Sequence, residues 1–349
     1  MPGNSAGRLA RLETLRGVAS LAVVFHHIAQ QLSGDLLVHS AGGRLLLWLG
    51  GWGVTVFFVL SGFCIHGSVL RHNGPGPLKP DWRRYALHRA RRILPGYFTC
   101  LALSCLLGAW AGSPLINPPW MISVLAHATF LSSFRYDTAL GINSVLWTVV
   151  VEVHFYLFYP LFVRWRNAVG VTRLALLLLA LSFAIKAGGR LWLGAEARWT
   201  WHHLFLNLWW IWALGALLAE IYAGRIARPR WAALWQHQIS GVLIVAASVL
   251  VGCIDGRLRP DLWLVVESYL LPLLAAGVVG VAAFSHRPLP RQPLTGHLGL
   301  ISYSMYLFHP AALWVVFNWL PSWPVAGLAL AWLLAEVGYH WVERPFLKR

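Results

Sequence analysis

Ten apolar stretches, each close to the length of a membrane-spanning helix, constrain this chain more than any other feature of its sequence. An α-helix needs roughly 20 mostly apolar residues to cross a bilayer. The shorter apolar run around Met121–Leu131 follows two prolines, and we interpret it as a re-entrant or interfacial segment. We predict an all-α polytopic membrane protein with spans at 14–33, 46–69, 94–112, 144–163, 172–188, 203–223, 239–254, 263–284, 298–319 and 323–342.

The low content of charged residues supports the same fold class. Hydrophobic residues make up 58% of the chain and charged residues only 11%, whereas a soluble domain carries about 25% charged residues. The chain has too few polar side chains to cover a soluble surface, so we treat residues 1–349 as one integral membrane domain. The basic residues gather between the apolar stretches, which is a topology signal and predicts no nucleic-acid partner.

The distribution of basic residues predicts the orientation of the chain. With ten spans, 21 of the 28 Lys and Arg residues fall on the side that holds both termini, and 7 fall on the other side. Because loops rich in Lys and Arg stay in the cytoplasm, we expect both termini to be cytoplasmic. No metal site is predicted, since the four cysteines lack metal-ligand spacing: Cys64, Cys100, Cys105 and Cys253.

Ionisable residues inside the predicted spans are candidates for function, because charged groups are rare and costly in a bilayer. In the first span, Arg16 is followed eleven residues later by His27. Eleven residues make about three helical turns, so the two side chains share one face, about 16 Å apart along the axis. The same geometry turns His26 about 100° away, and we expect it to be a structural bystander. A structural histidine bonded to a neighbouring carbonyl is the alternative for His27 itself.

Two more polar side chains reach the predicted depth of His27. Glu152 falls halfway along the fourth span, where a lone carboxylate is expensive unless it is paired. We expect His27 to be its partner. His309, in the ninth span, comes to a similar depth.

Two other features allow both a structural and a functional interpretation. Ser61-Gly62 in the second span permits close packing of helices, and Ser61 is also a candidate for lining a site. Arg89 and Arg92 share a helical face at the predicted cytoplasmic surface, where guanidinium groups can bind phosphates bidentately. The alternative is a basic patch that holds anionic membrane lipids.

These segments, taken in order, resemble the acyltransferase-3 family of integral membrane acyltransferases. Glu13 stands where many members have Asp, and Thr148 where many have Ser. Many members carry an SGNH-type domain after the membrane part, but the last predicted span ends near Val342, so we expect a stand-alone form. The matching segments are Leu15-Arg16-Gly17 with His27, Phe58-Val-Leu-Ser-Gly-Phe63, Arg89-x-x-Arg92-Ile-x-Pro95, Leu146-Trp147 with Glu152-x-x-Phe155-Tyr156-Leu157 and Pro160, Ile301-Ser-Tyr-Ser-x-Tyr306-Leu-x-His309-Pro310, and Val342-Glu-Arg-Pro-Phe346.

The resemblance implies a membrane O-acyltransferase of the bacterial inner membrane. Such an enzyme moves an acyl group, usually acetyl, from cytoplasmic acyl-CoA (acetyl-CoA) to a hydroxyl of a carbohydrate or glycolipid acceptor, and no metal is implied. The resemblance carries five functional residues over to this chain, His27 and Glu152 in catalysis and Arg16, Arg89 and Arg92 at the donor. Four more residues are candidates for lining the site: Ser61, Trp147, Tyr156 and His309. Neither the acceptor, the acyl chain length nor the oligomeric state is specified.

A mechanism can be written for His27 on this basis. A neutral imidazole can accept the proton of a sugar hydroxyl as that hydroxyl attacks the thioester carbonyl. Glu152 would orient the ring and stabilise the imidazolium. Direct transfer and an acyl-histidine intermediate both stay open. The main alternative function is a transporter or flippase for a glycolipid or polyprenyl-linked glycan, which also needs polytopic helices and buried charges.

Overall fold

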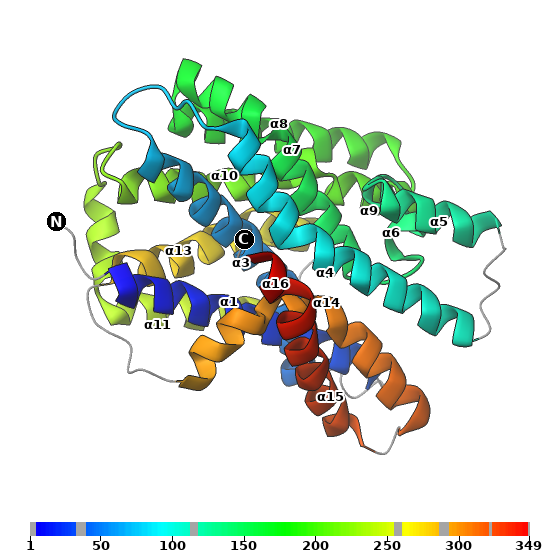
Figure 1. Ribbon diagram of the computed structural model, residues 1–349. Helices are drawn as coiled ribbons and strands as arrows, with labels where there is room; N and C mark the ends of the chain where they lie inside the picture. Colours follow the sequence, from blue (N-terminus) through cyan, green and yellow to red (C-terminus); the bar gives the residue numbers. More distant parts are fainter. Residues whose placement is uncertain are drawn as a thin grey trace.

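The protein is a bundle of long helices. The computed structural model describes residues 5–32, 40–111, 118–254, 260–285, 293–320 and 323–347, and none of these residues lies in a β-strand. Figure 1 shows α7, α8 and α10 on one side of the bundle and α14 and α15 on another. The main helices are α1 (Ser5–Gln31), α3 (Ala41–His72), α4 (Trp82–Trp110), α7 (Leu146–Val169), α8 (Val171–Trp192), α10 (Phe205–Tyr222), α11 (Gln238–Ile254), α13 (Leu271–Phe284), α14 (Pro293–Trp319) and α15 (Pro324–Val337).

Shorter helical elements extend or connect these helices. The helix α13 continues without a break from α12 and a π-helical turn, and α15 continues into a second π-helical turn and α16. The short elements are α5 (Pro118–Ala128), η1 (Ser132–Phe134), α6 (Tyr136–Leu140), α9 (Ala195–His203), η2 (Arg230–Gln236), α12 (Pro260–Val265), η3 (Val266–Leu270), η4 (Gly338–Glu343) and α16 (Arg344–Leu347).

All ten predicted spans are helical, and the all-α fold class is confirmed. Eight helices of the described chain are long and apolar enough to cross a membrane. The other two are α1, which carries several charged residues in its first half and two histidines in its second half, and α11, which is apolar but has only 17 residues. The predicted interfacial segment around Met121 contains α5, whose 11 residues are too few to cross a bilayer. The Tyr97 hydroxyl donates to the backbone carbonyl of His127 at 2.9 Å and ties α5 to α4.

One boundary differs usefully from its prediction. The sequence becomes apolar near residue 94, but α4 already begins at Trp82, because Asp81 caps it by accepting a hydrogen bond from the backbone N–H of Arg84 at 3.0 Å. Arginine favours helix formation, so the basic stretch continues the same helix. Arg89 and Arg92 are therefore held on a rigid helix rather than on a loop.

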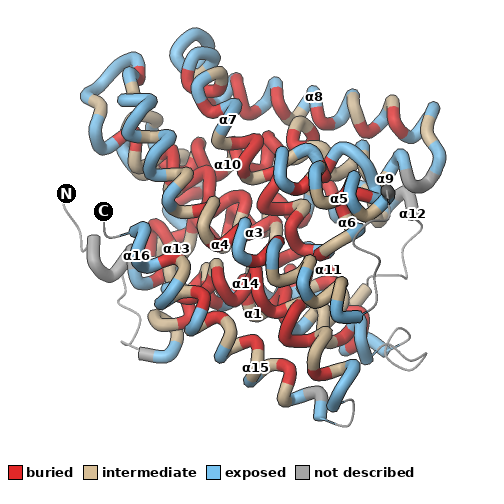
Figure 2. Tube along the Cα trace, turned by 45° about the vertical axis from the view of Figure 1, so that its right-hand side comes forward, coloured by how far each residue is buried: buried red, intermediate tan, exposed pale blue. Residues whose placement is uncertain are grey.

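The centre of the bundle depends on close helix packing. Figure 2 shows buried residues concentrated on α3, α10 and α14, whereas α8 turns much of its length outward. A side chain at Gly62 of α3 would collide with the backbone carbonyl of Trp212 on α10, and one at Gly215 of α10 would collide with the carbonyl of Val59. The predicted packing role of Ser61-Gly62 is confirmed, since small residues let helices approach this closely.

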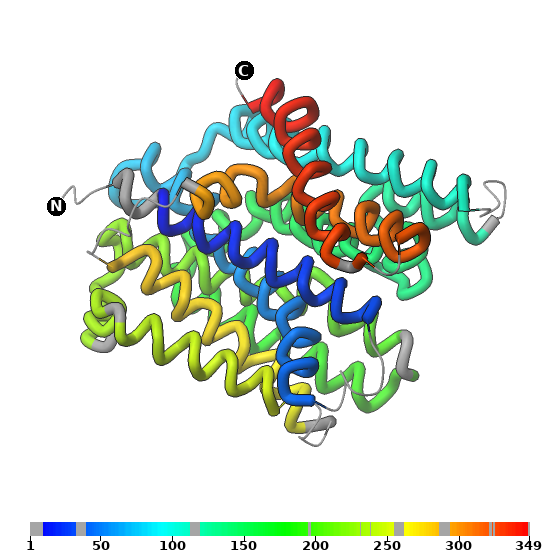
Figure 3. Tube along the Cα trace, turned by 90° about the horizontal axis from the view of Figure 1, so that it is seen from below, coloured from blue at the N-terminus to red at the C-terminus, as the bar shows by residue number. Residues whose placement is uncertain are grey.

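The N-terminal helix lies inside this assembly. Figure 3 shows α1 beside α13 and α14, and it also packs along α3. Its two polar residues of interest, Arg16 and His27, therefore face other helices at two different levels of the bundle.

Candidate active site

Two cavities lie at different levels of the bundle and meet at one partition. Along α3, Gly50 and Gly51 line only the larger cavity, of about 770 Å³, and Ser61 and Cys64 line only the smaller one, of about 120 Å³. Each cavity therefore lies on its own side of the shared wall. Four residues line both and form that partition: Val54, Phe58, Thr148 and Tyr306. The Thr148 and Tyr306 hydroxyls are hydrogen-bonded at 2.5 Å, so a polar bridge between α7 and α14 forms part of it.

The smaller cavity, called here the arginine cavity, collects most of the predicted donor and lining residues. The structure brings together side chains from α1, α3, α4, α7 and α14 that are far apart in the sequence. They are Arg16, Ser61, Arg89, Arg92, Glu152, Tyr156 and Tyr303.

The three arginines of this cavity are unequally paired. The Arg16 guanidinium lies 3.7 Å from the Cys64 sulfur, and Arg89 lies 5.9 Å from the Tyr156 ring centroid, with its Nε unbonded. Among the residues that the structure describes, neither has a carboxylate within ion-pair distance. Arg92 differs, because its Nη1 lies 3.4 Å from a carboxylate oxygen of Glu343. The cavity thus offers two guanidinium groups to an anion.

Glu152 lies in the arginine cavity and not beside His27. Its carboxylate is half-buried and accepts a hydrogen bond from the hydroxyl of Tyr156, one helical turn along α7. The expected pairing of Glu152 with His27 is therefore wrong. Two residues can lie at the same depth in the bilayer and still face different neighbours, because each helix is also rotated about its own axis. That rotation is set by packing against other helices.

A proline explains how Tyr156 is fixed. Pro160 has no N–H to give to the carbonyl four residues earlier, which belongs to Tyr156. The Tyr85 hydroxyl donates to that carbonyl at 3.3 Å. Tyr156 is thus held through its backbone by α4 and bonds Glu152 through its side chain.

His27 lines the larger cavity, called here the histidine cavity. Its Nδ1 lies 2.9 Å from the carbonyl oxygen of Val23 and 3.2 Å from Nε2 of His309. The Nδ1 of His309 lies 3.1 Å from the carbonyl of Met305 and also bonds the carbonyl of Tyr306. The Tyr306 carbonyl is available because Pro310 cannot donate to it.

These contacts select one pair of neutral tautomers. Because only an N–H can bond a carbonyl oxygen, both histidines carry their proton on Nδ1. The Nε2 of His309 then accepts from the Nδ1–H of His27, which shares its proton with the Val23 carbonyl. The Nε2 of His27 keeps its lone pair and has no hydrogen-bond partner among the described residues. His309, and not Glu152, orients this ring.

The remaining predicted residues divide between the two cavities. Trp147 lines the histidine cavity. Ser61 lines the arginine cavity and lies 3.3 Å from the indole nitrogen of Trp212, so it has both a packing and a lining position. The expected bystander His26 bonds the Leu47 carbonyl at 2.5 Å, yet it also lines the histidine cavity, which the helical-wheel argument missed.

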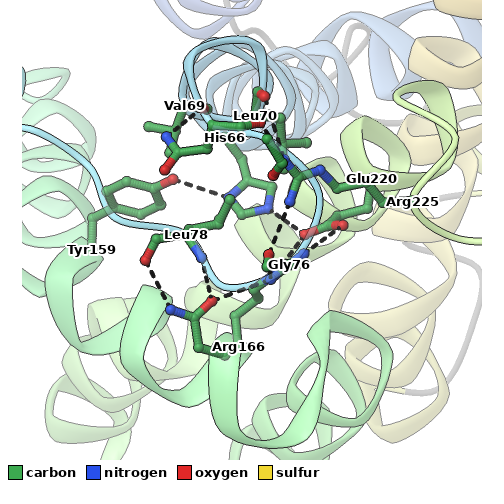
Figure 4. Close-up of polar contacts among 12 residues, drawn as sticks. His66, Val69, Leu70, Gly76, Leu78, Tyr159, Arg166, Glu220 and Arg225 are labelled. Atoms are coloured by element: carbon green, nitrogen blue, oxygen red, sulfur yellow. Dashed lines mark hydrogen bonds and ion pairs between the residues drawn. The ribbon is translucent and has the colours of Figure 1, made fainter.

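Sequence reasoning also missed a buried ion-pair cluster, called here the sealed cluster and drawn in Figure 4. His66 bonds the Tyr159 hydroxyl and a carboxylate oxygen of Glu220, each at 3.0 Å. Arg166 binds both oxygens of Glu220, at 2.6 and 3.0 Å. Its Nη1 and that of Arg225 each donate to the carbonyl of Gly76 at 3.2 Å. The signal was a lone glutamate near the end of a very apolar helix, which requires a partner.

The family relationship is decided by comparison with known proteins. A family model described as an acyltransferase domain matches residues 9–338. The chain belongs to the acyltransferase-3 family. It is 25% identical to a putative peptidoglycan O-acetyltransferase, YrhL, of Bacillus subtilis. The alignment covers 96% of this chain and 54% of YrhL. It is 27% identical to nodulation protein 10 of Rhizobium leguminosarum, with 95% and 94% covered.

O-acetyltransferase OatA of Staphylococcus aureus is a third relative of this family member, 25% identical over 98% of the chain and 57% of OatA. The chain spans somewhat over half the length of YrhL and OatA. No solved structure matches it significantly. Within the described ranges, no group of three or more His, Cys, Asp and Glu side chains is arranged to hold a metal ion. With its apolar helices and bacterial relatives, the chain is a multi-pass integral membrane protein of the bacterial plasma membrane.

Proposed function

We propose that this acyltransferase-3 family member moves an acyl group, acetyl in the simplest case, from acyl-CoA in the arginine cavity to a carbohydrate hydroxyl in the histidine cavity. The observation that carries the proposal is the shared partition of the two cavities, which lies beside the bonded pair His27 and His309. Tyr306 belongs to the partition, and its ring centroid lies 6.1 Å from that of His309. Two substrates that enter from either side would therefore meet next to a histidine with a free lone pair.

The arginine cavity suits the donor. Acyl-CoA carries phosphates at one end of a thin pantetheine arm and the thioester at the other. Arg89 lines this cavity, and its guanidinium has no carboxylate partner among the described residues. It would bind phosphate, since charge-assisted bidentate bonds favour that group. Glu152 and Ser61 would accept hydrogen bonds from the amide N–H groups of the arm. We place this cavity on the cytoplasmic side, because most basic residues are predicted to face the cytoplasm.

His27 would act as the general base. Its Nε2 takes the proton of the acceptor hydroxyl while the hydroxyl oxygen attacks the thioester carbonyl; the carbon–sulfur bond then breaks, and the imidazolium returns its proton to the CoA thiolate. The Val23 carbonyl and the Nε2 of His309 accept from Nδ1–H and stabilise the imidazolium in between. An acyl-histidine intermediate uses the same atoms, and rapid quenching for acylated protein distinguishes it from direct transfer.

The names of the relatives support a glycan acceptor. YrhL is described as a putative peptidoglycan O-acetyltransferase and OatA as an O-acetyltransferase. We therefore propose a carbohydrate or glycolipid hydroxyl as the acceptor of this chain and acetyl-CoA as its donor.

The test follows labelled acetyl from acetyl-CoA to a panel of 4-nitrophenyl glycosides in proteoliposomes. The wild type should acetylate at least one glycoside, and His27→Ala should lower the rate by about 10²–10⁴-fold, the usual contribution of a general base. His72→Ala removes an exposed histidine at the end of α3 and should retain the wild-type rate. Unchanged transfer by His27→Ala contradicts the base. Movement of a labelled glycolipid without thioester consumption would instead establish the transporter alternative.

A further inference from the structure

Basic residues outnumber carboxylates in the described lining of the histidine cavity. Among the described residues, this lining contains the cations Lys186, Arg190 and Arg198 and the carboxylate Glu267. These three cations are called here the cation cluster. His202 lies within electrostatic range of all three, so they converge on one part of the cavity. Like charges that line one part of a cavity favour an anionic ligand between them.

Lys186 is the member that surface charge cannot explain. It lies in the membrane-spanning helix α8, and only 7% of its surface is exposed. Its ammonium group lies 5.4 Å from the ring centroid of Tyr269, and no described residue accepts a hydrogen bond from it. Glu267 attracts it only from within electrostatic range. A lysine in a span is costly, and such residues mark substrate pathways.

An aromatic cluster shares the lining with these cations. The rings of Trp199 and His203 stack with centroids 4.3 Å apart and an angle of 28° between their planes. Trp147 meets His203 edge-on at 4.8 Å and Trp199 at 5.7 Å. All three residues line the histidine cavity, where they offer a rigid surface to the C–H face of a sugar ring.

Resting on the acyl transfer proposed above, we propose that the acceptor is an anionic glycan. The cation cluster binds its carboxylate or phosphate group, and the sugar ring lies against the aromatic cluster with one hydroxyl directed to His27. A carboxylate on the sugar and a phosphate on a carrier lipid present the same chemistry to guanidinium and ammonium groups. A neutral glycan would offer the buried ammonium group of Lys186 no charged partner at hydrogen-bond distance.

The experiment measures binding to the intact protein in lipid nanodiscs without any acyl donor. The first pair of probes is 4-nitrophenyl β-glucuronide and 4-nitrophenyl β-glucoside, which share the ring and differ in the carboxylate. The second pair is geranyl phosphate and geraniol, which places the anion on the lipid. The anionic member of at least one pair should bind about tenfold more tightly or better, and the preference should shrink with added salt.

Charge-removing variants assign that preference to the cluster. The double variant Lys186→Met with Arg198→Gln should abolish the preference. Arg198→Gln alone should reduce it at least threefold, and because Arg198 is exposed, this single variant keeps the test possible if the double variant does not fold. Arg164→Gln is the matched control, because Arg164 is exposed on α7 and lines neither cavity. The pair that shows the preference identifies whether the anion belongs to the sugar or to the lipid.

Equal binding within both pairs, including no binding of any probe, overturns the proposal, and so does a preference that survives in the variants. Because no donor is present, these outcomes are independent of the proposed chemistry. If the chain transfers no acetyl group, the binding preference is still measured. If the preference is missing, acetyl-CoA consumption can still be measured in the transfer assay.

Discussion

The arginine cavity and the sealed cluster are built from the same residue types and differ in how they are satisfied. Both contain arginine, glutamate and tyrosine side chains, and each contains a tyrosine of α7. In the sealed cluster, the glutamate is 1% exposed and binds an arginine through both oxygens. In the arginine cavity, two arginines lack a carboxylate among the described residues, and the glutamate is bonded by a neutral hydroxyl.

This difference separates a structural role from a binding role. Arg166, Glu220 and Arg225 also line a cavity, of about 960 Å³, but the carboxylate there is already bound by Arg166 and His66. An ion pair satisfied in this way has little left to offer a ligand, and it fixes the helices that carry it. Arg166 and Arg225 extend the sealed cluster to the loop after α3, where both donate to Gly76. An unpaired guanidinium in a cavity keeps its charge and its donors for an anion. Substitutions in the sealed cluster should therefore lower stability, and substitutions in the arginine cavity should weaken donor binding.

The largest effect is expected at the centre of the sealed cluster. Glu220→Gln leaves the Arg166 guanidinium without its carboxylate, and breaking a buried pair in this way typically costs about 3–5 kcal/mol. The apparent melting temperature in detergent should fall strongly, and the apparent KM for acetyl-CoA of the folded fraction should not change. Glu336→Gln is the control, since that carboxylate is 26% exposed and should cost less than about 1 kcal/mol. Equal melting of the two variants would contradict the structural role.

The next effect concerns an unpaired arginine of the cavity. Arg89→Gln should raise the apparent KM for acetyl-CoA about tenfold or more, because it removes charge-assisted bonds to phosphate, each worth about 1.5–3 kcal/mol. The melting temperature should stay close to that of the wild type, since no buried carboxylate loses its partner. Arg84→Gln, at an exposed position on the same helix, controls for surface charge. If both variants have the same KM, Arg89 does not bind the donor.

Arg92 is the intermediate case, because it faces the cavity and also pairs with Glu343, which is 1% exposed. Arg92→Gln should therefore raise the KM for acetyl-CoA and lower stability by about 1–3 kcal/mol, the cost of a buried group left without its partner. Kinetics and thermal melting on the same preparation measure both effects. The double variant Arg92→Gln with Glu343→Gln separates the two roles if it regains stability while its KM for acetyl-CoA stays high. If its KM returns to the wild-type value together with stability, Arg92 has a structural role like that of Arg166 in the sealed cluster.

The spans and the shared helical face of Arg16 and His27 could be predicted from the sequence, because both depend on position along a single helix. A bilayer imposes the length of an apolar helix, and helix periodicity places Arg16 and His27 on one face. Whether Glu152 faces His27 or the arginine cavity depends on how α7 is rotated against α3 and α14, which no single helix encodes. The same limit hid the sealed cluster, since His66, Arg166 and Glu220 come from three helices.

The cation cluster shows a related limit. The sequence identifies Lys186 and Arg198 only as basic residues on the side opposite the termini, because their convergence requires α8 and α9 to line the same cavity as α1 and α3. His309 was predicted at the right depth, but its bond to His27 depends on how α14 packs against α1 and on the Met305 carbonyl that holds its Nδ1–H. Polar residues in spans could therefore be recognised from the sequence, whereas their pairing required the packed bundle.

The smallest predicted effects form a matched pair on α7, where Tyr156 faces the arginine cavity and Tyr159 the sealed cluster. Each Tyr→Phe substitution removes one hydroxyl and leaves the ring. Tyr159→Phe leaves a ring nitrogen of His66 buried without its partner, so it should cost about 1–3 kcal/mol of stability and leave the KM for acetyl-CoA unchanged. Tyr156→Phe frees the carboxylate of Glu152 in an open cavity, so stability should change little.

The same Tyr156→Phe change should raise the KM for acetyl-CoA by about two- to tenfold, because a net hydrogen bond worth about 0.5–1.5 kcal/mol no longer holds Glu152 in place. Melting curves and donor kinetics on the two variants provide the measurement, and each variant is the control for the other. If both lose stability equally, the arginine cavity is closed in the same way as the sealed cluster. A raised KM in Tyr156→Phe alone shows instead that one turn of α7 separates a residue that holds the bundle from a residue that holds the donor.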